Sequence, residues 1–185
     1  MRLLIMGPPG AGKGTQATKI AETFGIAHIS TGDLFRANLS QGTALGLEAK
    51  KYMDAGEYVP DSVTNDMVRD RFTHADAQAG FLLDGYPRTV DQVEQLDEML
   101  GDKGLDKVLV LTADTDEVVS RLLNRAKEQG RADDTEEVIR RRLEVYEEQT
   151  APLIALYSAR GILVSVDGLG SIDEVADRIN SVLNV

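Results

Sequence analysis

Residues 7–15 read GPPGAGKGT and decide the fold of this chain. The apolar run Leu3–Met6 directly before them is typical of a buried strand, and a helical pattern follows from Lys13 to Phe24. In a turn between a strand and a helix, glycines let backbone N–H groups converge on phosphate oxygens, and the helix N-terminus adds partial positive charge. Lys13 then reaches the terminal phosphates. The segment therefore predicts a phosphate loop that binds a nucleoside triphosphate.

Short apolar runs recur along the rest of the chain, and longer helical patterns separate them. Continuously apolar strands between helices indicate a parallel sheet that is covered on both faces. The sequence therefore predicts an α/β fold, a P-loop three-layer α/β/α domain with a five-stranded parallel sheet. The expected strands are 3–6, 27–30, 81–83, 108–111 and 162–166, and the expected helices are 13–24, 45–55, 62–72, 90–100, 116–126, 135–158 and 172–183.

Three local features modify this alternation. The segment Thr31–Pro60 holds helical patterns without a strong strand, which indicates a small helical excursion from the core. Lys127–Gly130 is a polar, glycine-bearing break between two helices. Pro152 falls inside the last long helical pattern and is expected to kink or restart it, because proline lacks the N–H that a helix interior uses.

Composition excludes several classes of function. The 185 residues carry 31 acidic and 20 basic side chains, a formal charge of −11, and no cysteine. Disulfides, thiolate zinc sites and thiol nucleophiles are therefore excluded, and so acidic a chain is a poor partner for nucleic acid or an anionic membrane. No apolar stretch approaches the roughly 20 residues that span a bilayer, and Met1–Met6 is too short for a signal-peptide core. We expect a cytoplasmic protein.

Arginines gather where phosphate chemistry needs them. The segment 121–142 holds seven basic and five acidic residues, so it is locally basic in an acidic chain. Arg121 and Arg125 are four residues apart and share one face of a helix. A solvated charged face explains Arg140 and Arg141, but other arginines follow strands or lie in the helical excursion. The candidates for phosphate contact are Arg36, Arg88, Arg121, Arg125, Arg131 and Arg142.

Six motifs, in this order, carry a family resemblance. They are GPPGAGKGT at 7–15, ISTGDLFR at 29–36, GEYVP at 56–60, LDGYPRT at 83–89 with the glutamine at 92, GRADD at 130–134 and VDG at 166–168. Over essentially its whole length the chain resembles the adenylate kinase family. That family also has a glycine between the lysine and the hydroxyl of its phosphate loop, as Gly14 stands here before Thr15.

The resemblance implies an activity and an organisation. The expected reaction is reversible, Mg²⁺-dependent phosphoryl transfer from ATP to AMP that gives two ADP and maintains adenine nucleotide balance. The single domain would comprise a CORE (1–29, 60–125 and 132–185), an AMP-binding insert (30–59) and a short lid (126–131). A lid this short, in a chain without cysteine, implies no structural zinc. Family members imply a cytoplasmic monomer whose partners are ATP, AMP and ADP, with no nucleic acid and no membrane.

Single residues take expected roles by the same resemblance. Asp84 would hold Mg²⁺ through water, and Tyr86-Pro87 is a candidate cis peptide. The implied ATP site is Gly10, Ala11, Gly12, Lys13, Gly14, Thr15, Arg121, Arg125 and Gly170. The implied AMP site is Thr31, Arg36, Glu57, Tyr58, Val59, Gly85, Tyr86, Pro87, Arg88, Gln92, Arg131 and Arg142. The implied catalytic residues are Lys13, Arg36, Arg88, Arg125, Arg131 and Arg142.

Alternatives stay open at the level of sequence. A kinase for UMP or CMP would share the phosphate loop, although Thr31 and Gln92 favour adenine, and a P-loop switch would need no second arginine set. Gln92 also lies three residues after Thr89, the spacing of a capping box. Asp133 and Asp134 are candidate caps for the next helix, whereas the resemblance suggests a contact with the closed lid. No chemistry is assigned to His28 or His74.

Overall fold

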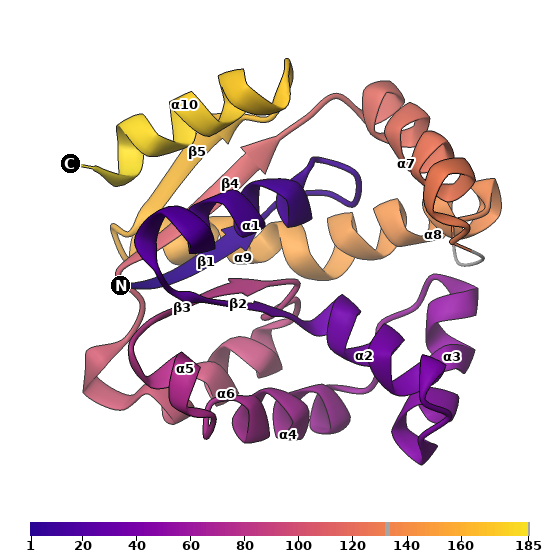
Figure 1. The fold of residues 1–185 in the computed structure, drawn as a ribbon, viewed down its shortest axis with the longest axis horizontal. Helices are drawn as coiled ribbons and strands as arrows, with labels where there is room; N and C mark the ends of the chain where they lie inside the picture. The colour runs from indigo at the N-terminus through magenta and orange to yellow at the C-terminus, as the bar shows by residue number, and fades with distance from the viewer. Residues whose placement is uncertain (132–133, 185) are drawn as a thin grey trace.

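Five parallel strands form one sheet in the order β2-β3-β1-β4-β5 in the computed structural model, which describes residues 1–131 and 134–184 (Figure 1). The predicted fold class is confirmed, and every expected strand lies within one residue of its observed bounds. The strands are β1 Arg2–Met6, β2 Ala27–Ser30, β3 Phe81–Asp84, β4 Lys107–Thr112 and β5 Leu163–Asp167.

Helices cover both faces of the sheet and make three layers (Figure 1). Alternate residues of β1 explain why this strand is apolar throughout: Leu4 and Met6 belong to one core, and Leu3 and Ile5 belong to the other. The first core is closed by α4 Asp61–Arg71, α5 Ala75–Gln78, α6 Val90–Leu100 and α9 Ala151–Ala159, and the second by α1 Lys13–Phe24 and α10 Ile172–Leu183.

Two helix pairs stand outside the layers. The helical excursion contains α2 Thr31–Ser40 and α3 Ala44–Ala55, which share a small core around Phe35 and Ala49. The other pair is α7 Thr115–Gln129 and α8 Glu136–Val145, packed through Leu122, Ile139 and their neighbours. Each pair follows a strand, β2 or β4, so both pairs extend from the carboxyl ends of the parallel strands (Figure 1).

Two of the expected helices differ from their predicted bounds, each for a local reason. Helix α7 continues through Lys127–Gln129, and Gly130 ends it in the left-handed conformation at φ 60°, so the expected break is narrower. The predicted helix 135–158 is divided by a π-helical turn, Tyr146–Thr150, before α9. Pro152 causes this break, because its missing N–H and its ring disrupt the regular α-helical ladder.

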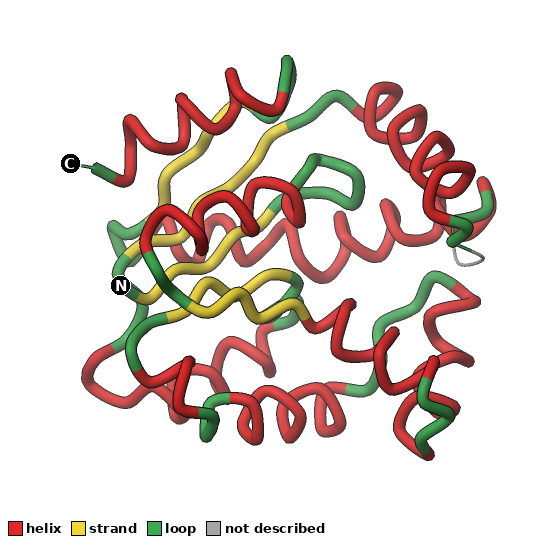
Figure 2. The backbone as a smooth tube through the Cα atoms, viewed as in Figure 1, coloured by secondary structure: helices red, strands yellow, loops and turns green. Residues whose placement is uncertain are grey.

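None of the helices in the described part of the chain is long and apolar enough to cross a membrane. Figure 2 traces the loop that leaves β1 and enters α1, which is the quoted phosphate loop.

Candidate active site

A cleft of about 900 Å³ opens at the carboxyl ends of the strands. Strand β1 has β3 on one side and β4 on the other, and neither is its neighbour in sequence. At such a switch of strand order the connections leave in opposite directions, which is where α/β proteins bind ligands. The cleft is lined by the loop after β1, by the start of α2 after β2, and by Asp84 and Gly85 at the end of β3.

The phosphate loop has the backbone that its glycines predict. Gly12 is the N-cap of α1 at φ 92°, and Gly10 has φ 82°. A Cβ on Gly10 would stand 2.8 Å from Leu122 Cγ, so this position accepts no side chain without displacing α7. Lys13 Nζ donates to Pro8 O at 3.1 Å and thus lies folded back over its own loop.

Positive charge accumulates around the loop. Burial lowers the pKa of the Lys13 ammonium to about 8; the carboxylate of Asp84 opposes this shift, and Arg88, Arg125 and Arg142 add to it. Four cationic side chains, those of Lys13, Arg88, Arg125 and Arg142, therefore line one cleft. A polyanion entering this cleft would relieve their mutual repulsion, which is what the binding of a phosphate chain requires.

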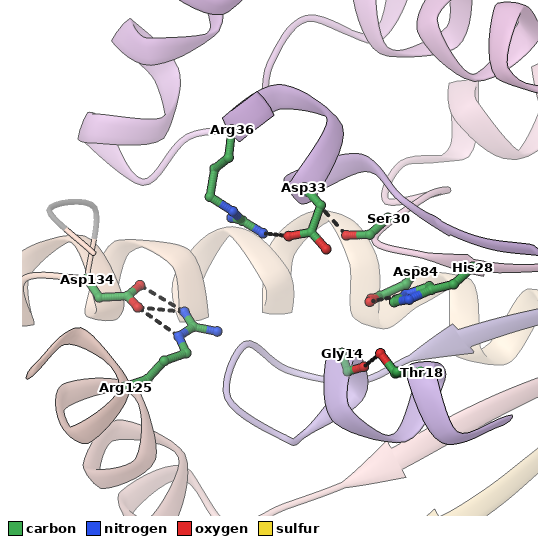
Figure 3. A network of polar contacts seen from close by, with 9 residues as sticks. All are labelled: Gly14, Thr18, His28, Ser30, Asp33, Arg36, Asp84, Arg125 and Asp134. Atoms are coloured by element: carbon green, nitrogen blue, oxygen red, sulfur yellow. Dashed lines mark hydrogen bonds and ion pairs between the residues drawn. The ribbon is translucent and has the colours of Figure 1, made fainter. Parts of the chain in front are cut away.

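The start of α2 forms one wall of the cleft. Thr31 Oγ1 donates to Gly85 O at 3.0 Å. Gly85 has φ 84°, and a Cβ on it would stand 2.8 Å from the Thr31 hydroxyl, so this position favours glycine. Arg36 donates to Asp33 Oδ1 at 2.6 Å (Figure 3). Burial opposes ionisation of Asp33, but the hydrogen bond and charge of Arg36 outweigh it and hold the pKa of this carboxyl below its usual value.

Gln92 is buried at the base of this wall and uses both ends of its amide. Its Oε1 accepts from the backbone N–H of Arg88 at 2.7 Å, and its Nε2 donates to Asp61 Oδ1 at 2.8 Å. The backbone N–H of Gln92 donates to Thr89 Oγ1 at 3.2 Å, so Thr89 caps α6. Half of the suggested capping box is therefore present, while the glutamine side chain turns to Arg88 and Asp61 instead.

The opposite wall carries a buried carboxylate between two arginines. Asp134 accepts from Arg125 Nε at 2.8 Å and Nη2 at 2.9 Å (Figure 3). It also accepts from Arg142 Nη1 at 2.5 Å. Its side chain has no exposed surface. The residue that caps α8 is Thr135, so the capping role suggested for Asp134 is wrong. Asp133 lies outside the described residues.

Arg121 lies at the outer end of the cleft. Its Nη1 donates to Gly168 O at 3.3 Å and its Nε to Glu117 Oε1 at 3.2 Å. Gly170, two residues farther along the same loop, also lines the cleft. This places a flat cationic side chain beside main chain from the loop after β5, an arrangement suited to the sides and edge of a planar base.

The residues around Asp84 fit hydrated Mg²⁺. Asp84 lies at the end of β3 with 11% of its side chain exposed, and it faces the phosphate loop, where a Cβ on Gly14 would stand 3.8 Å from its Oδ2. Thr15 lines the same cleft. Among the described residues, no group of three His, Asp or Glu could hold a metal alone. Carboxylate and hydroxyl oxygens, with water and phosphate, are the ligands that Mg²⁺ prefers.

Comparison with known proteins identifies the family. The adenylate kinase family model matches residues 5–162. The chain belongs to the adenylate kinase family. An adenylate kinase of Kocuria rhizophila is 66% identical, with 98% of each chain covered, and one of Nocardioides sp. is 65% identical over 100% of this chain and 98% of its own. One of Thermobifida fusca is 56% identical, with 99% and 98% covered. The UMP/CMP alternative receives no support.

The structure brings together the residues that the resemblance to adenylate kinases implied, with one exception. Tyr86 is fully buried and does not line the cleft; its hydroxyl donates to Asn65 Oδ1 at 2.7 Å. The Tyr86-Pro87 peptide is cis, as expected. The others all line the cleft: Gly10, Ala11, Gly12, Lys13, Gly14, Thr15, Thr31, Arg36, Glu57, Tyr58, Val59, Asp84, Gly85, Pro87, Arg88, Gln92, Arg121, Arg125, Arg131, Arg142 and Gly170.

Three polar residues were not singled out from the sequence: His28 and Thr150 line the cleft, and Asp61 contacts Gln92, which lines it. His28 Nε2 lies 3.2 Å from Asp84 Oδ2 (Figure 3). The partner of Gln92, Asp61, opens α4, and Thr150 closes the π-helical turn. None stands in a motif that marks chemistry. The position of His28 in β2, a strand that ends at the cleft, was a sequence signal that pointed to it. Only the sheet order reveals that β2 pairs with β3, which carries Asp84.

Proposed function

We propose that this chain transfers the terminal phosphoryl group of ATP to AMP, reversibly, through the residues described above. The observation that carries the proposal is that one cleft contains the phosphate loop and, facing it, a second set of arginines on α2 and after β3. A nucleotide switch needs only the first of these. Phosphoryl transfer between two nucleotides requires two adjacent anion sites.

The ATP side is assigned to the phosphate loop and α7. Backbone N–H groups of Gly10–Thr15 and the ammonium of Lys13 hold the phosphates, because they converge at the N-terminus of α1. Arg121 and the loop at Gly170 hold the base end. Asp84, with Thr15, would hold Mg²⁺ through water, and the bound ion would offset negative charge on the phosphate chain.

The AMP side is assigned to the insert and the loop after β3. Arg36 and Arg88 approach from different elements and would fork onto the phosphate of AMP. Thr31, Gln92 and the main chain of Glu57–Val59 would surround its base. Arg131, Arg142 and Arg125, from the α7–α8 side, would neutralise charge on the group in transfer.

Phosphoryl transfer to AMP requires no general base. The attacking atom is a phosphate oxygen that is already ionised, so no proton has to be removed from it. The protein has to align two polyanions, offset their repulsion and exclude water, which would otherwise accept the phosphoryl group. Arginine suits this role because its planar fork binds phosphate bidentately and keeps its charge at physiological pH.

The division into a CORE (1–29, 60–125 and 132–185), an AMP-binding insert (30–59) and a short lid (126–131) is part of the proposal. The insert corresponds to α2 and α3, and the lid to the end of α7 and the turn after it. A cytoplasmic location and a monomeric state stay expectations of the family.

Acceptor specificity and two variants test the proposal. ADP formation from Mg·ATP is measured with AMP, UMP, CMP or GMP as acceptor, for the wild-type chain, Lys13→Met and Arg88→Ala. We expect AMP to be preferred by orders of magnitude, and both variants to lose turnover by orders of magnitude while keeping the wild-type circular dichroism spectrum. Comparable rates with all four acceptors, or near-wild-type rates for either variant, would contradict the assignment.

A further inference from the structure

Thr150 occupies an unusual place between the insert and Arg88. It is the last residue of the π-helical turn and is 5% exposed. Its Oγ1 donates to Arg88 O at 2.8 Å and lies 2.6 Å from the hydroxyl of Tyr58. One buried hydroxyl therefore contacts the main chain of a residue assigned to phosphate and a side chain of the proposed insert.

The number of available hydrogens fixes the direction of these hydrogen bonds. A threonine hydroxyl has one hydrogen, and the carbonyl of Arg88 can only accept. Thr150 therefore donates to Arg88, and Tyr58 must donate to Thr150. The result is a directed chain from phenol to threonine to carbonyl. Hydrogen bonds in such a chain polarise and strengthen one another, and the loss of the middle member breaks both links.

Arg88 is held at three points by this arrangement. Its N–H donates to Gln92 Oε1 at 2.7 Å, and its carbonyl accepts from Thr150 at 2.8 Å. Its guanidinium lies 5.0 Å from the ring centroid of Tyr58, within range of a cation–π interaction. Tyr58 thus contacts both ends of the arginine, the guanidinium through its ring and the carbonyl through Thr150.

The π-helical turn is what gives Thr150 this position. The N–H of Ala151 bonds to Tyr146 O, five residues back, and Pro152 prevents a return to the α-helical ladder at the next residue. The widened turn accommodates one more residue than an α-helical turn, and this rotates Thr150 relative to α8. Such turns are frequently found at functional sites, and Thr150 and Tyr146 of this turn line the cleft.

We propose that Thr150 is a positioning residue for the AMP half-reaction, and that its hydroxyl couples closure of the insert, through Tyr58, to the placement of the Arg88 guanidinium. The proposal rests on the proposed function, because it needs Arg88 to contact the phosphate of AMP. It differs from a purely structural role in one respect. Loss of the hydroxyl should weaken steps that involve AMP and leave ATP binding unchanged.

Three variants separate the positioning role from a structural one. Thr150→Val removes the hydroxyl at nearly constant volume, Thr150→Ser retains it, and Tyr58→Phe removes only the first link while keeping the ring over Arg88. Thr23→Val is the matched control, because the hydroxyl of Thr23 bonds to Lys19 O at 2.8 Å on an exposed face of α1. Each is characterised by kcat, by KM for AMP and for ATP, and by thermal unfolding.

The expected pattern is specific. Thr150→Val should raise KM for AMP, or lower kcat/KM for AMP, about tenfold, as the loss of one to two hydrogen bonds implies, with KM for ATP within twofold of wild type. Thr150→Ser should restore AMP kinetics to within about threefold. The double variant Tyr58→Phe/Thr150→Val should be no worse than Thr150→Val alone, because both changes break one chain.

Several results would overturn the proposal. They are unchanged AMP kinetics in Thr150→Val despite a lower melting temperature, equal losses for AMP and ATP, failure of Thr150→Ser to restore activity, or multiplicative effects in the double variant. If Thr150→Val does not fold, Tyr58→Phe and Thr150→Ser still decide, since unchanged AMP kinetics in Tyr58→Phe removes the coupling. Failure of the wild-type chain to form ADP from ATP and AMP would instead refute the proposed function.

Discussion

Replacing Asp134 with asparagine removes one buried negative charge from between two arginines of the cleft. The carboxylate accepts three charge-assisted hydrogen bonds, at 2.8 and 2.9 Å from Arg125 and at 2.5 Å from Arg142, and its side chain is fully buried. An asparagine amide has one acceptor oxygen and one donor NH₂ group. The NH₂ group faces at least one guanidinium, which can only donate, so no hydrogen bond forms there. The bidentate bond to Arg125 is therefore lost.

The expected cost follows from burial. Breaking a buried ion pair costs about 3–5 kcal/mol. Because the side chains of Arg125 and Arg142 are 29% and 18% exposed, water partly compensates them, so we take the lower end, about 3 kcal/mol. At about 2–4 °C per kcal/mol for a chain of this size, the melting temperature should fall by about 6–12 °C. Two misplaced arginines should also lower kcat/KM about a hundredfold.

The matched control is Asp76→Asn. Asp76 binds Arg71 through both oxygens at 2.8 and 2.7 Å, but its side chain is 57% exposed. The bond geometry is thus similar and the burial differs, so the control should leave melting temperature and activity nearly unchanged. Thermal unfolding followed by circular dichroism, with ADP formation measured alongside, is the assay. Equal melting temperatures for the two variants, or wild-type activity in Asp134→Asn, would show that the buried carboxylate does not hold the two arginines in place.

Three further predictions follow from the cleft. The folded-state pKa of Lys13, about 8 instead of 10.5, disfavours its charged form, so the free protein should gain stability between about pH 8 and pH 10.5. Binding of a non-hydrolysable ATP analogue should then take up a proton near pH 8–9, and calorimetry in two buffers of different ionisation enthalpy that finds no uptake would contradict this. Gly10→Ala should abolish ATP binding, because its Cβ would stand 2.8 Å from Leu122 Cγ; unchanged affinity by calorimetry would be the contrary result. Gln92→Leu, which deprives Asp61 of a donor, should raise KM for AMP at least tenfold with KM for ATP unchanged, and steady-state kinetics that show equal changes would exclude a specific role.

The strands were predictable because the apolar pattern of a buried strand lies within the strand's own residues. Leu3–Met6 is apolar at every position since both faces of β1 are covered, and that pattern is visible without the fold. The phosphate loop was predictable for a similar reason, because Gly10 and Gly12 adopt positive φ values that other residues avoid. The arginines were predictable from spacing and family motifs together.

Other features depend on partners far along the chain. In the sequence, Asp134 was a candidate helix cap, while the family resemblance suggested a contact with the closed lid; only the packing of α7 on α8 brings Arg125 to it. Pro152 indicated a break in the helix but not a π-helical turn, and nothing near Thr150 in sequence points to Arg88, 62 residues away. The contact between His28 and Asp84 likewise follows from the pairing of β2 with β3.

Direct transfer between two facing sites is best tested by ³¹P NMR of the purified chain with Mg·ATP and AMP. ADP signals should grow at the expense of both substrates, without inorganic phosphate, because the two sites transfer the group directly and exclude water. Release of inorganic phosphate from ATP while AMP stays unchanged would contradict direct transfer, and the second set of arginines would then need another explanation.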